Sequence, residues 1–327
     1  MGDRAENHWH DEPNMLTLGR MGSALRFLAH HGRLCLVFGL LVGIALPSVA
    51  TALRPFLPEI VGCLLALTAM RIGLRQTVGE LSGARDVIGL VLGLQVAAPV
   101  LAITVLNLVG QNDSLVGLAV VLMLAAPSIS GSPALTLLLD HEPAPAMRLL
   151  LTGTLLLPLT IIPVLWLVPA LGSLADVIQA ALRLALVIAI SVGLGFAVRG
   201  KLFPEPGQTV LATLDGAVAL FLAILVVALM SALGPALRET PLLVLSWLVF
   251  AFLLNFGTQI LAGTLRGKPD FAAVGVVAGN RNIALFLVAL PAAVTDPLLV
   301  FIGCYQVPMY LTPILMRRFY ARRPDPA

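Results

Sequence analysis

Arg281 is the side chain with the clearest chemical consequence, in the segment Gly279-Asn280-Arg281-Asn282. The segment lies midway along an apolar stretch, 271–291, that is long enough to span a bilayer. A guanidinium keeps its proton. At the bilayer centre it costs roughly 3 kcal/mol on insertion scales, and more than about 10 kcal/mol in simulations of an isolated helix. We therefore expect Arg281, with Gly279, Asn280 and Asn282, to line a polar cavity that binds a ligand or an ion.

A second group of polar and helix-breaking residues lies midway along the apolar stretch 115–139, in the segment 127–133. Two prolines and a glycine predict a broken helix, whose free backbone groups need water, ions or a ligand. The residues that break the helix are Pro127, Gly131 and Pro133, and the candidate binding residues are Ser128, Ser130 and Ser132. Close packing of small residues is the alternative for this segment.

Three amide side chains lie at moderate depth in other apolar stretches, namely Gln95, Asn255 and Gln259. They could face the same cavity, or they could hydrogen-bond between helices. Tyr305 and Gln306 are weaker candidates.

The elements that position these residues are predicted to be membrane-spanning helices. The chain is 59% hydrophobic and 11% charged, whereas a soluble protein is about a quarter charged. Its net charge of +3 gives no support for a nucleic-acid partner. Apolar stretches separated by charged or Pro/Gly turns predict ten spans, at 33–53, 55–73, 87–108, 115–139, 147–169, 180–200, 210–230, 241–265, 271–291 and 298–317.

The two halves of the chain resemble each other at an offset of 150 residues, with Arg33 matching Arg183 and Pro158 matching Pro308. The predicted repeats are 33–169 and 180–318. Five helices in each half make the second half cross the membrane in the opposite sense, which is an inverted-topology repeat typical of secondary transporters. The same offset places 280–282 opposite 130–132, and paired helix interruptions mark the binding site of such proteins.

The positive-inside rule predicts that both termini are cytoplasmic. Most of the 20 Lys and Arg residues then lie inside, and only Arg54, Arg183 and Arg238 lie outside. Residues 1–14 are polar and do not resemble a signal peptide. We expect residues 1–32 to form a tail with a surface helix over 15–30, and 319–327 to form a second tail, in a bacterial-type inner membrane.

On these residues the chain resembles the bile acid:sodium symporter family. The resemblance covers 33–318 and rests on the inverted repeat, the two interrupted helices, and Gln95 four residues before Pro99. It implies that helices four and nine cross near the membrane centre. It also implies a panel domain of spans one, two, five, six, seven and ten, and a core domain of spans three, four, eight and nine. Movement of core against panel would give alternating access to organic anions.

The sodium-binding motifs of that family match poorly here. The ninth-helix pattern is roughly Glu-x-Gly-x-Gln-Asn; Gly279 and Asn282 match, but Val277 replaces the Glu and Arg281 the Gln. In the fourth-helix pattern, roughly Pro-Gly-Gly-Thr-Ala-Ser-Asn, Pro127 and Ser132 match, Ser130 could stand in for Thr, and Pro133 takes the Asn position. Gln95 matches a residue that takes part in sodium binding in the family.

We therefore expect a secondary transporter of small organic anions in which the guanidinium of Arg281 replaces bound sodium. No cofactor or firm metal site is predicted, and the partners would be the substrate and membrane lipids. An auxin-efflux-like carrier and a membrane sensor that does not transport its ligand are the alternatives. We expect no enzyme, because His-Glu-x2-His, Gly-x-Ser-x-Gly and paired intramembrane carboxylates are all missing from the sequence.

Overall fold

A computed structural model describes residues 22–81, 85–266 and 270–321 of the chain. Over these ranges every regular element is a helix, and one isolated β-bridge joins Ser128 to Arg281. Helices are expected because an apolar chain in a membrane must satisfy its backbone groups within each segment. The predicted all-α polytopic membrane fold is thus confirmed at this level.

The helices between Gly32 and Leu108 are α2 (Gly32–Ala45), α3 (Pro47–Leu53), η1 (Arg54–Phe56), α4 (Leu57–Ile72), α5 (Leu74–Leu81), α6 (Arg85–Leu92), the π-helix η2 (Gly93–Ala97) and α7 (Ala98–Leu108). Those from Leu115 to Glu239 are α8 (Leu115–Ala125), α9 (Ser132–Leu138), α10 (Ala144–Trp166), η3 (Pro169–Leu171), α11 (Leu174–Leu202), α12 (Gln208–Leu229) and α13 (Leu233–Glu239). The remainder are α14 (Pro241–Arg266), α15 (Phe271–Gly279), η4 (Ile283–Leu285), α16 (Phe286–Ala289), α17 (Ala292–Thr295), η5 (Asp296–Leu298), α18 (Leu299–Leu315) and α19 (Arg317–Ala321).

Seven helices in the described part of the chain are long and apolar enough to cross a membrane, or up to eight if one bent pair counts as a single span. They are Pro47–Ile72, Asp86–Leu108, Ala144–Trp166, Leu174–Leu202, Gln208–Glu239, Pro241–Arg266 and Ala292–Ala321. This number falls short of the ten that the sequence predicts. The predicted spans 115–139 and 271–291 are interrupted in the middle, and 33–53 is divided at Leu46 by the proline that begins α3.

Local signals explain where several helices begin and bend. Ser173 and Asp176 form a capping box, so α11 begins at Leu174, six residues before the predicted span. Both α10 and α18 continue through two internal prolines, at Pro158 and Pro163 in α10 and at the corresponding positions in α18.

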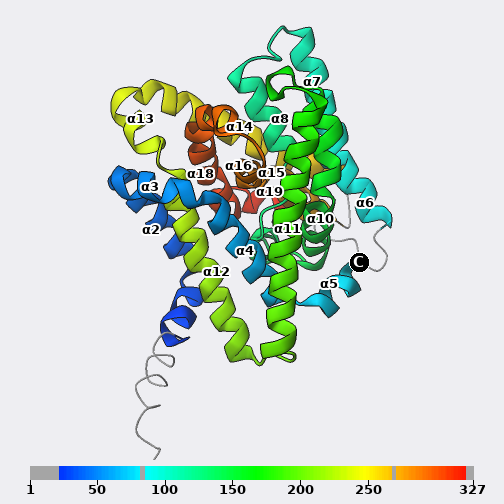
Figure 1. The fold of residues 1–327 in the computed structure, drawn as a ribbon, viewed down its shortest axis with the longest axis vertical. Coiled ribbons are helices and arrows are strands. Elements are labelled where there is room, and N and C mark those ends of the chain that lie inside the picture. The colour runs from blue at the N-terminus through cyan, green and yellow to red at the C-terminus, as the bar shows by residue number, and fades with distance from the viewer. Residues whose placement is uncertain (1–21, 82–84, 267–269, 322–327) are drawn as a thin grey trace, which may run out of the picture.

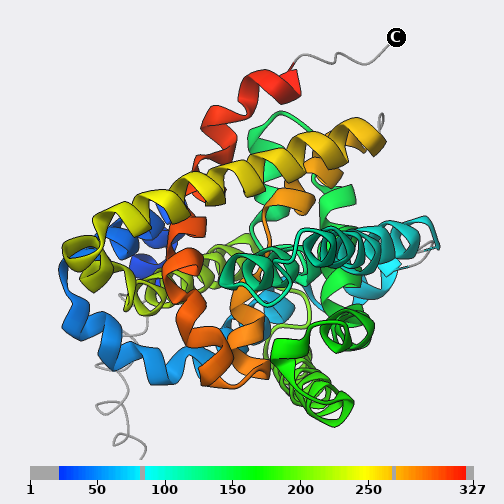
Figure 2. The same ribbon diagram turned by 90° about the horizontal axis from the view of Figure 1, so that it is seen from above.

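The interrupted helices lie in the middle of the fold. Figure 1 shows α15 and α16 near the centre, with α10 and α11 on one side and α2, α3 and α12 on the other. All nine residues of α15 are buried. Figure 2 shows α14 along one side, next to the short helix α19. Arg281 therefore lies buried in the middle of the fold.

The ends of the chain differ in part from the predicted boundaries. Residues 1–21 and 322–327 lie outside the described residues, so most of the predicted tails is not tested. Gly22–His30 is helical and turns by 93° from Leu34–Ala45, whereas its placement on a membrane surface stays a prediction. The predicted boundary between 318 and 319 falls inside α19, where Tyr320 is fully buried.

Candidate functional site: two interrupted helices around a buried guanidinium

The two predicted helix interruptions are both present, and they contact each other through their backbones. The amide of Ile129 donates to the carbonyl of Asn280 at 3.0 Å, and the amide of Asn282 donates to the carbonyl of Pro127 at 2.8 Å. Ser128 and Arg281 thereby form the antiparallel bridge. Each interruption thus provides hydrogen-bond partners for backbone N–H and C=O groups of the other. Such partners are needed because these groups have lost their helical bonds in an apolar environment.

The first interruption follows from proline. Helix α8 ends at Ala125, and Ala126 is extended with φ −63° and ψ 151°. A residue that precedes proline is disfavoured in the helical region of φ/ψ space. Pro127 therefore keeps Ala126 extended, and the helix ends at Ala125. Pro133 then occupies the first turn of α9, where its missing N–H is not needed.

Arg281 is 2% exposed, and its guanidinium donates to three backbone carbonyls. Nε donates to Ala278 O at 2.9 Å, Nη1 to Ala126 O at 2.9 Å, and Nη2 to Leu94 O at 3.4 Å. We call these three oxygens the carbonyl cage. They belong to the end of α15, the end of α8 and the π-helix η2, so one side chain joins three separate stretches of chain.

Two of the cage carbonyls are free because their helical donors bond elsewhere. In a continuous helix Ala278 O would accept from the amide of Asn282, which instead binds Pro127 O. Leu94 O would accept from the amide of Ala98, which the π-helix directs to Gly93 O. One residue further on stands Pro99, which has no N–H.

The charge of Arg281 is balanced by dipoles. The last carbonyls of a helix carry partial negative charge, and α8 and α15 both end at the guanidinium. None of the ion pairs in the described part of the chain involves Arg281. A structural ion pair between Arg281 and a buried carboxylate is therefore absent from the described residues.

Asn255 and Gln259 belong to a hydrogen-bonded group that we call the polar network. Its members come from α14, the second interruption, α18 and α19, and all are 0% exposed: Asn255, Gln259, Asn280, Tyr305, Thr312 and Tyr320. Asn255 Nδ2 and Tyr305 Oη both donate to the carbonyl of Gly279.

Gln259 connects the rest of the polar network. Its Nε2 donates to Asn255 Oδ1 at 2.7 Å and to Thr312 Oγ1 at 3.0 Å, and its Oε1 accepts from Tyr320 Oη at 3.0 Å. Thr312 Oγ1 lies 3.2 Å from Asn280 Oδ1. Asn255 and Gln259 thus hydrogen-bond to other helices and line neither of the two cavities described below, which corresponds to the second of the two predicted alternatives.

Gln95 also makes an interhelical contact. Its Oε1 accepts from Thr160 Oγ1 of α10 at 3.1 Å, and the residue is 2% exposed. A Cβ on Gly153 of α10 would lie 2.6 Å from Gln95 Nε2, so this glycine makes room for the amide. Gln95 therefore joins the π-helix to α10, beside the carbonyl cage but not in it.

The serines of the first interruption divide into two kinds. Ser128 Oγ donates to Ser132 Oγ at 2.5 Å, and both residues are buried. Ser130 and Asn282 are partly exposed and line cavities, and neither side chain makes a hydrogen bond within the described residues. These two are the predicted site residues best placed to contact a ligand.

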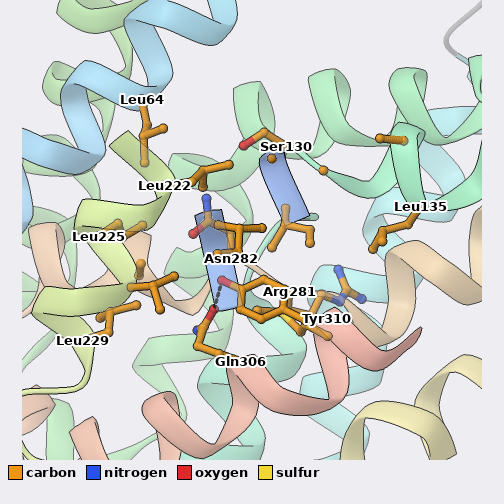
Figure 3. Close-up of a pocket in the computed structure, with 18 of the residues that line it drawn as sticks. Leu64, Ser130, Leu135, Leu222, Leu225, Leu229, Arg281, Asn282, Gln306 and Tyr310 are labelled. Carbon is orange, nitrogen blue, oxygen red and sulfur yellow. Dashed lines mark hydrogen bonds between the residues drawn. The ribbon is translucent and has the colours of Figure 1, made fainter. Parts of the chain in front are cut away.

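A cavity of about 380 Å³ adjoins the interruptions and is mostly apolar. Figure 3 shows it between Asn282 and three leucines of α12, which are Leu222, Leu225 and Leu229. In that view the guanidinium of Arg281 points away from these leucines, beyond the ring of Tyr310. A second cavity of about 220 Å³ lies on the side of α5, α10 and α11.

A sodium ion fits the arrangement around Arg281 poorly. The oxygens that would attract it already bind a fixed positive charge. A second unit charge 4 Å away would be repelled by about 4 kcal/mol at an effective dielectric constant of 20. The described residues also contain no cluster of three or more His, Cys, Asp or Glu side chains.

Several participants in the site were not predicted. The carbonyls of Leu94 and Ala126 carry no side-chain signal: in an α-helix Pro99 would free the carbonyl of Gln95, and only the π-helical register transfers that effect to Leu94. Thr312 and Tyr320 resemble ordinary helix residues in the sequence. Tyr305, a weaker candidate, proves to be fully buried against Gly279.

No protein-family model matches the chain, and no curated protein matches its sequence. The resemblance to bile acid:sodium symporters therefore stays a prediction from the motifs.

Proposed function

We propose that the protein is a sodium-independent secondary transporter of small organic anions, in which Arg281 takes the place of a bound cation. The observation that carries the proposal is the guanidinium held by the carbonyl cage at the contact of two interrupted helices. It supplies the charge that a bound cation would otherwise bring, and it is covalently retained.

The larger cavity supports an organic substrate. Small-molecule sites are mostly apolar with a few polar groups that orient the ligand. Here leucines form much of the wall, whereas Ser130 and Asn282 offer a hydroxyl and an amide. Arg281 also lines this cavity and would favour an anion even at a distance, because opposite unit charges 8 Å apart attract by about 2 kcal/mol at a dielectric constant near 20.

The finer architecture is part of the same proposal. Ten crossings in two inverted halves, both termini in the cytoplasm and a core that moves against a panel would give alternating access. Interruptions at corresponding places and paired prolines in α10 and α18 support the repeat. Single cysteines at Asp113, predicted outside, and Glu142, predicted inside, test the orientation by labelling from each side of the membrane.

The decisive experiment is a thermal-shift screen of the purified protein in lipid nanodiscs against small carboxylates and sulfonates, with sodium or with choline. We expect an anion that raises the melting temperature equally in both salts, because a ligand that binds only the folded state stabilises it. Arg281→Ala should weaken the shift, whereas Asn282→Ala should abolish it. Arg183→Ala, which changes an exposed arginine, is the matched control.

Uptake by reconstituted liposomes then tests transport. We expect uptake of the same anion with choline in place of sodium. Sodium-stimulated uptake would contradict the proposed role of Arg281. Ligand binding without uptake would favour the sensor.

A further inference from the structure

The smaller cavity, of about 220 Å³, reaches from the interruptions to the protein surface. Ser128, Ser130 and Asn282 of the interruptions line it in the middle of the fold. Its wall also includes Leu74 and Val78 of α5, which are 56% and 58% exposed. The cavity therefore has its mouth at α5.

Most of the wall of this cavity is apolar. Leucine, isoleucine, valine, alanine and phenylalanine side chains of α4, α5, α10 and α11 form the greater part of it. One of its threonines, Thr77, donates its hydroxyl proton to the carbonyl of Gly73 at 2.9 Å. A charged group would be costly to bury against such a wall, whereas a hydrocarbon chain would be favoured.

A guanidinium lies at the rim of the same cavity. Gly73 stands between Ile72 and Leu74, both of which line the cavity. A Cβ on Gly73 would lie 2.7 Å from Nε and 2.8 Å from Cζ of Arg199, so the guanidinium packs directly against this glycine. Its Nη1 donates to two carbonyls at the end of α4, at 2.6 and 2.7 Å. Nε and Nη2 donate to no acceptor in the described part of the chain and are available to a ligand.

A second arginine lies close by on α5. Arg75 is exposed and shares one side of α5 with Val78, three residues further on. It joins none of the ion pairs among the described residues, whereas Arg71 is paired with Asp215. Arg75 and Arg199 are both at the end of the molecule predicted to face the cytoplasm, where the bilayer surface is negatively charged.

We propose that the smaller cavity binds an anionic phospholipid. One acyl chain enters at α5 and lies against the apolar wall, and the phosphate binds Arg75 together with Nε and Nη2 of Arg199. Basic pockets between membrane helices on the cytoplasmic side are typical sites for such headgroups. The inference concerns the smaller cavity only, and it holds whether or not the larger cavity binds a substrate anion.

The test is native mass spectrometry of the full-length protein in detergent, titrated with dioleoylphosphatidylglycerol or dioleoylphosphatidylcholine. The two lipids have the same chains and differ in headgroup charge. We expect the first phosphatidylglycerol to bind more than tenfold more tightly than the first phosphatidylcholine, because each arginine near the phosphate contributes about fivefold. Glycerol 3-phosphate, which has no acyl chains, should not bind.

Substitutions at the rim test the phosphate site. Arg75→Ala changes an exposed side chain and should leave the fold intact, weaken phosphatidylglycerol binding about fivefold and leave phosphatidylcholine unaffected. Arg183→Ala is the matched control, because this exposed arginine lies on the same helix as Arg199 but about 24 Å away along its axis.

Substitutions in the walls test the acyl-chain site. Thr154 lines only the smaller cavity, so Thr154→Met should fill part of it and weaken both lipids at least fivefold. Ala134 lines only the larger cavity, so Ala134→Met should weaken neither. The melting temperature of each variant in lipid-free detergent shows that it is folded.

Three results would overturn the proposal. Equal affinities for the two lipids, or equal losses in Arg75→Ala and Arg183→Ala, would exclude the phosphate site. Wild-type lipid affinity in a folded Thr154→Met protein would exclude the acyl-chain site. Glycerol 3-phosphate that binds as tightly as phosphatidylglycerol would make the ligand a free phosphate instead of a lipid.

Discussion

The two interruptions occupy corresponding places in the chain but satisfy their backbones in opposite ways. The first, 126–131, offers two acceptors to the second, Ala126 O to the guanidinium and Pro127 O to the amide of Asn282. The second, 280–282, supplies those two donors and accepts one bond in return, from the amide of Ile129 to Asn280 O. The comparison indicates that neither interruption is complete alone: the carbonyls exposed by one helix are satisfied by a cation borne on the other.

The largest expected effect comes from removing that cation. Arg281→Ala should lower the free energy of unfolding by about 3 kcal/mol, because three buried carbonyls lose a charged donor. Thermal unfolding in nanodiscs measures it, with Arg183→Ala expected within about 0.5 kcal/mol of wild type. Free guanidinium ion should restore part of the loss in Arg281→Ala only. An Arg281→Ala protein as stable as wild type would show that the carbonyls find other donors.

Gly131, in the first interruption, and Gly279, which ends α15 just before the second, should respond differently to substitution by alanine. A Cβ on Gly279 would collide with the Gln259 side chain and the Asn255 carbonyl, whereas a Cβ on Gly131 would meet only Ile129 Cδ1 at 3.7 Å. We expect Gly279→Ala to cost about 1–3 kcal/mol of stability by overpacking and Gly131→Ala to be nearly neutral. Denaturation of the two variants side by side is the measurement, and equal costs would contradict the asymmetry.

Asn280 and Asn282 provide a comparison within one interruption. Asn280 is fully buried; its Nδ2 donates to Val276 O at 2.8 Å and its Oδ1 accepts from Thr312. Asn280→Ala should therefore cost about 1–2 kcal/mol, because Thr312 and the Val276 carbonyl lose partners. Asn282→Ala should leave the melting temperature almost unchanged and remove ligand-induced stabilisation. If Asn282→Ala lowered stability and Asn280→Ala removed only ligand-induced stabilisation, Asn282 would be the structural residue and Asn280 the binding residue.

The smallest expected effect tests the polar network at its outer end. Tyr320→Phe removes the donor to Gln259 Oε1 and should cost about 1 kcal/mol, since that oxygen is buried. Tyr310→Phe, at the cavity wall, should cost only a few tenths because water can reach Gln306. Equal melting temperatures for the two variants would place the Tyr320 hydroxyl outside the network.

The sequence was sufficient to locate the helix interruptions because prolines, glycines and a buried charge rarely gather in the middle of an apolar stretch unless its helix is broken. It also indicated that the two interruptions face each other. It could not show that Arg281 binds Leu94, since a backbone carbonyl has no residue type and the π-helix that frees it depends on packing against α10. Asn255 and Gln259 were ambiguous for a related reason: an amide satisfies a helix partner or a ligand with the same atoms.

The number of crossings was less predictable than the interruptions. Hydropathy treats 115–139 and 271–291 as whole segments, whereas the structure divides each into shorter helices. Where each helix ends depends on where the backbone N–H and C=O groups of the interruption find hydrogen-bond partners. Those partners lie about 150 residues away in the sequence, so local hydropathy does not reveal them.

The bonds of Arg281 also constrain how the molecule can rearrange. The segments that carry Leu94, Ala126 and Ala278 cannot part without leaving a buried charge unpaired, so they would travel as one rigid block. Sliding would then occur along the surfaces that α4, α12 and α18 present to that block. It would break the hydrogen bonds from Tyr305 and Thr312 of α18, so under the proposed alternating access these two hydroxyls would contribute to the barrier between the two forms.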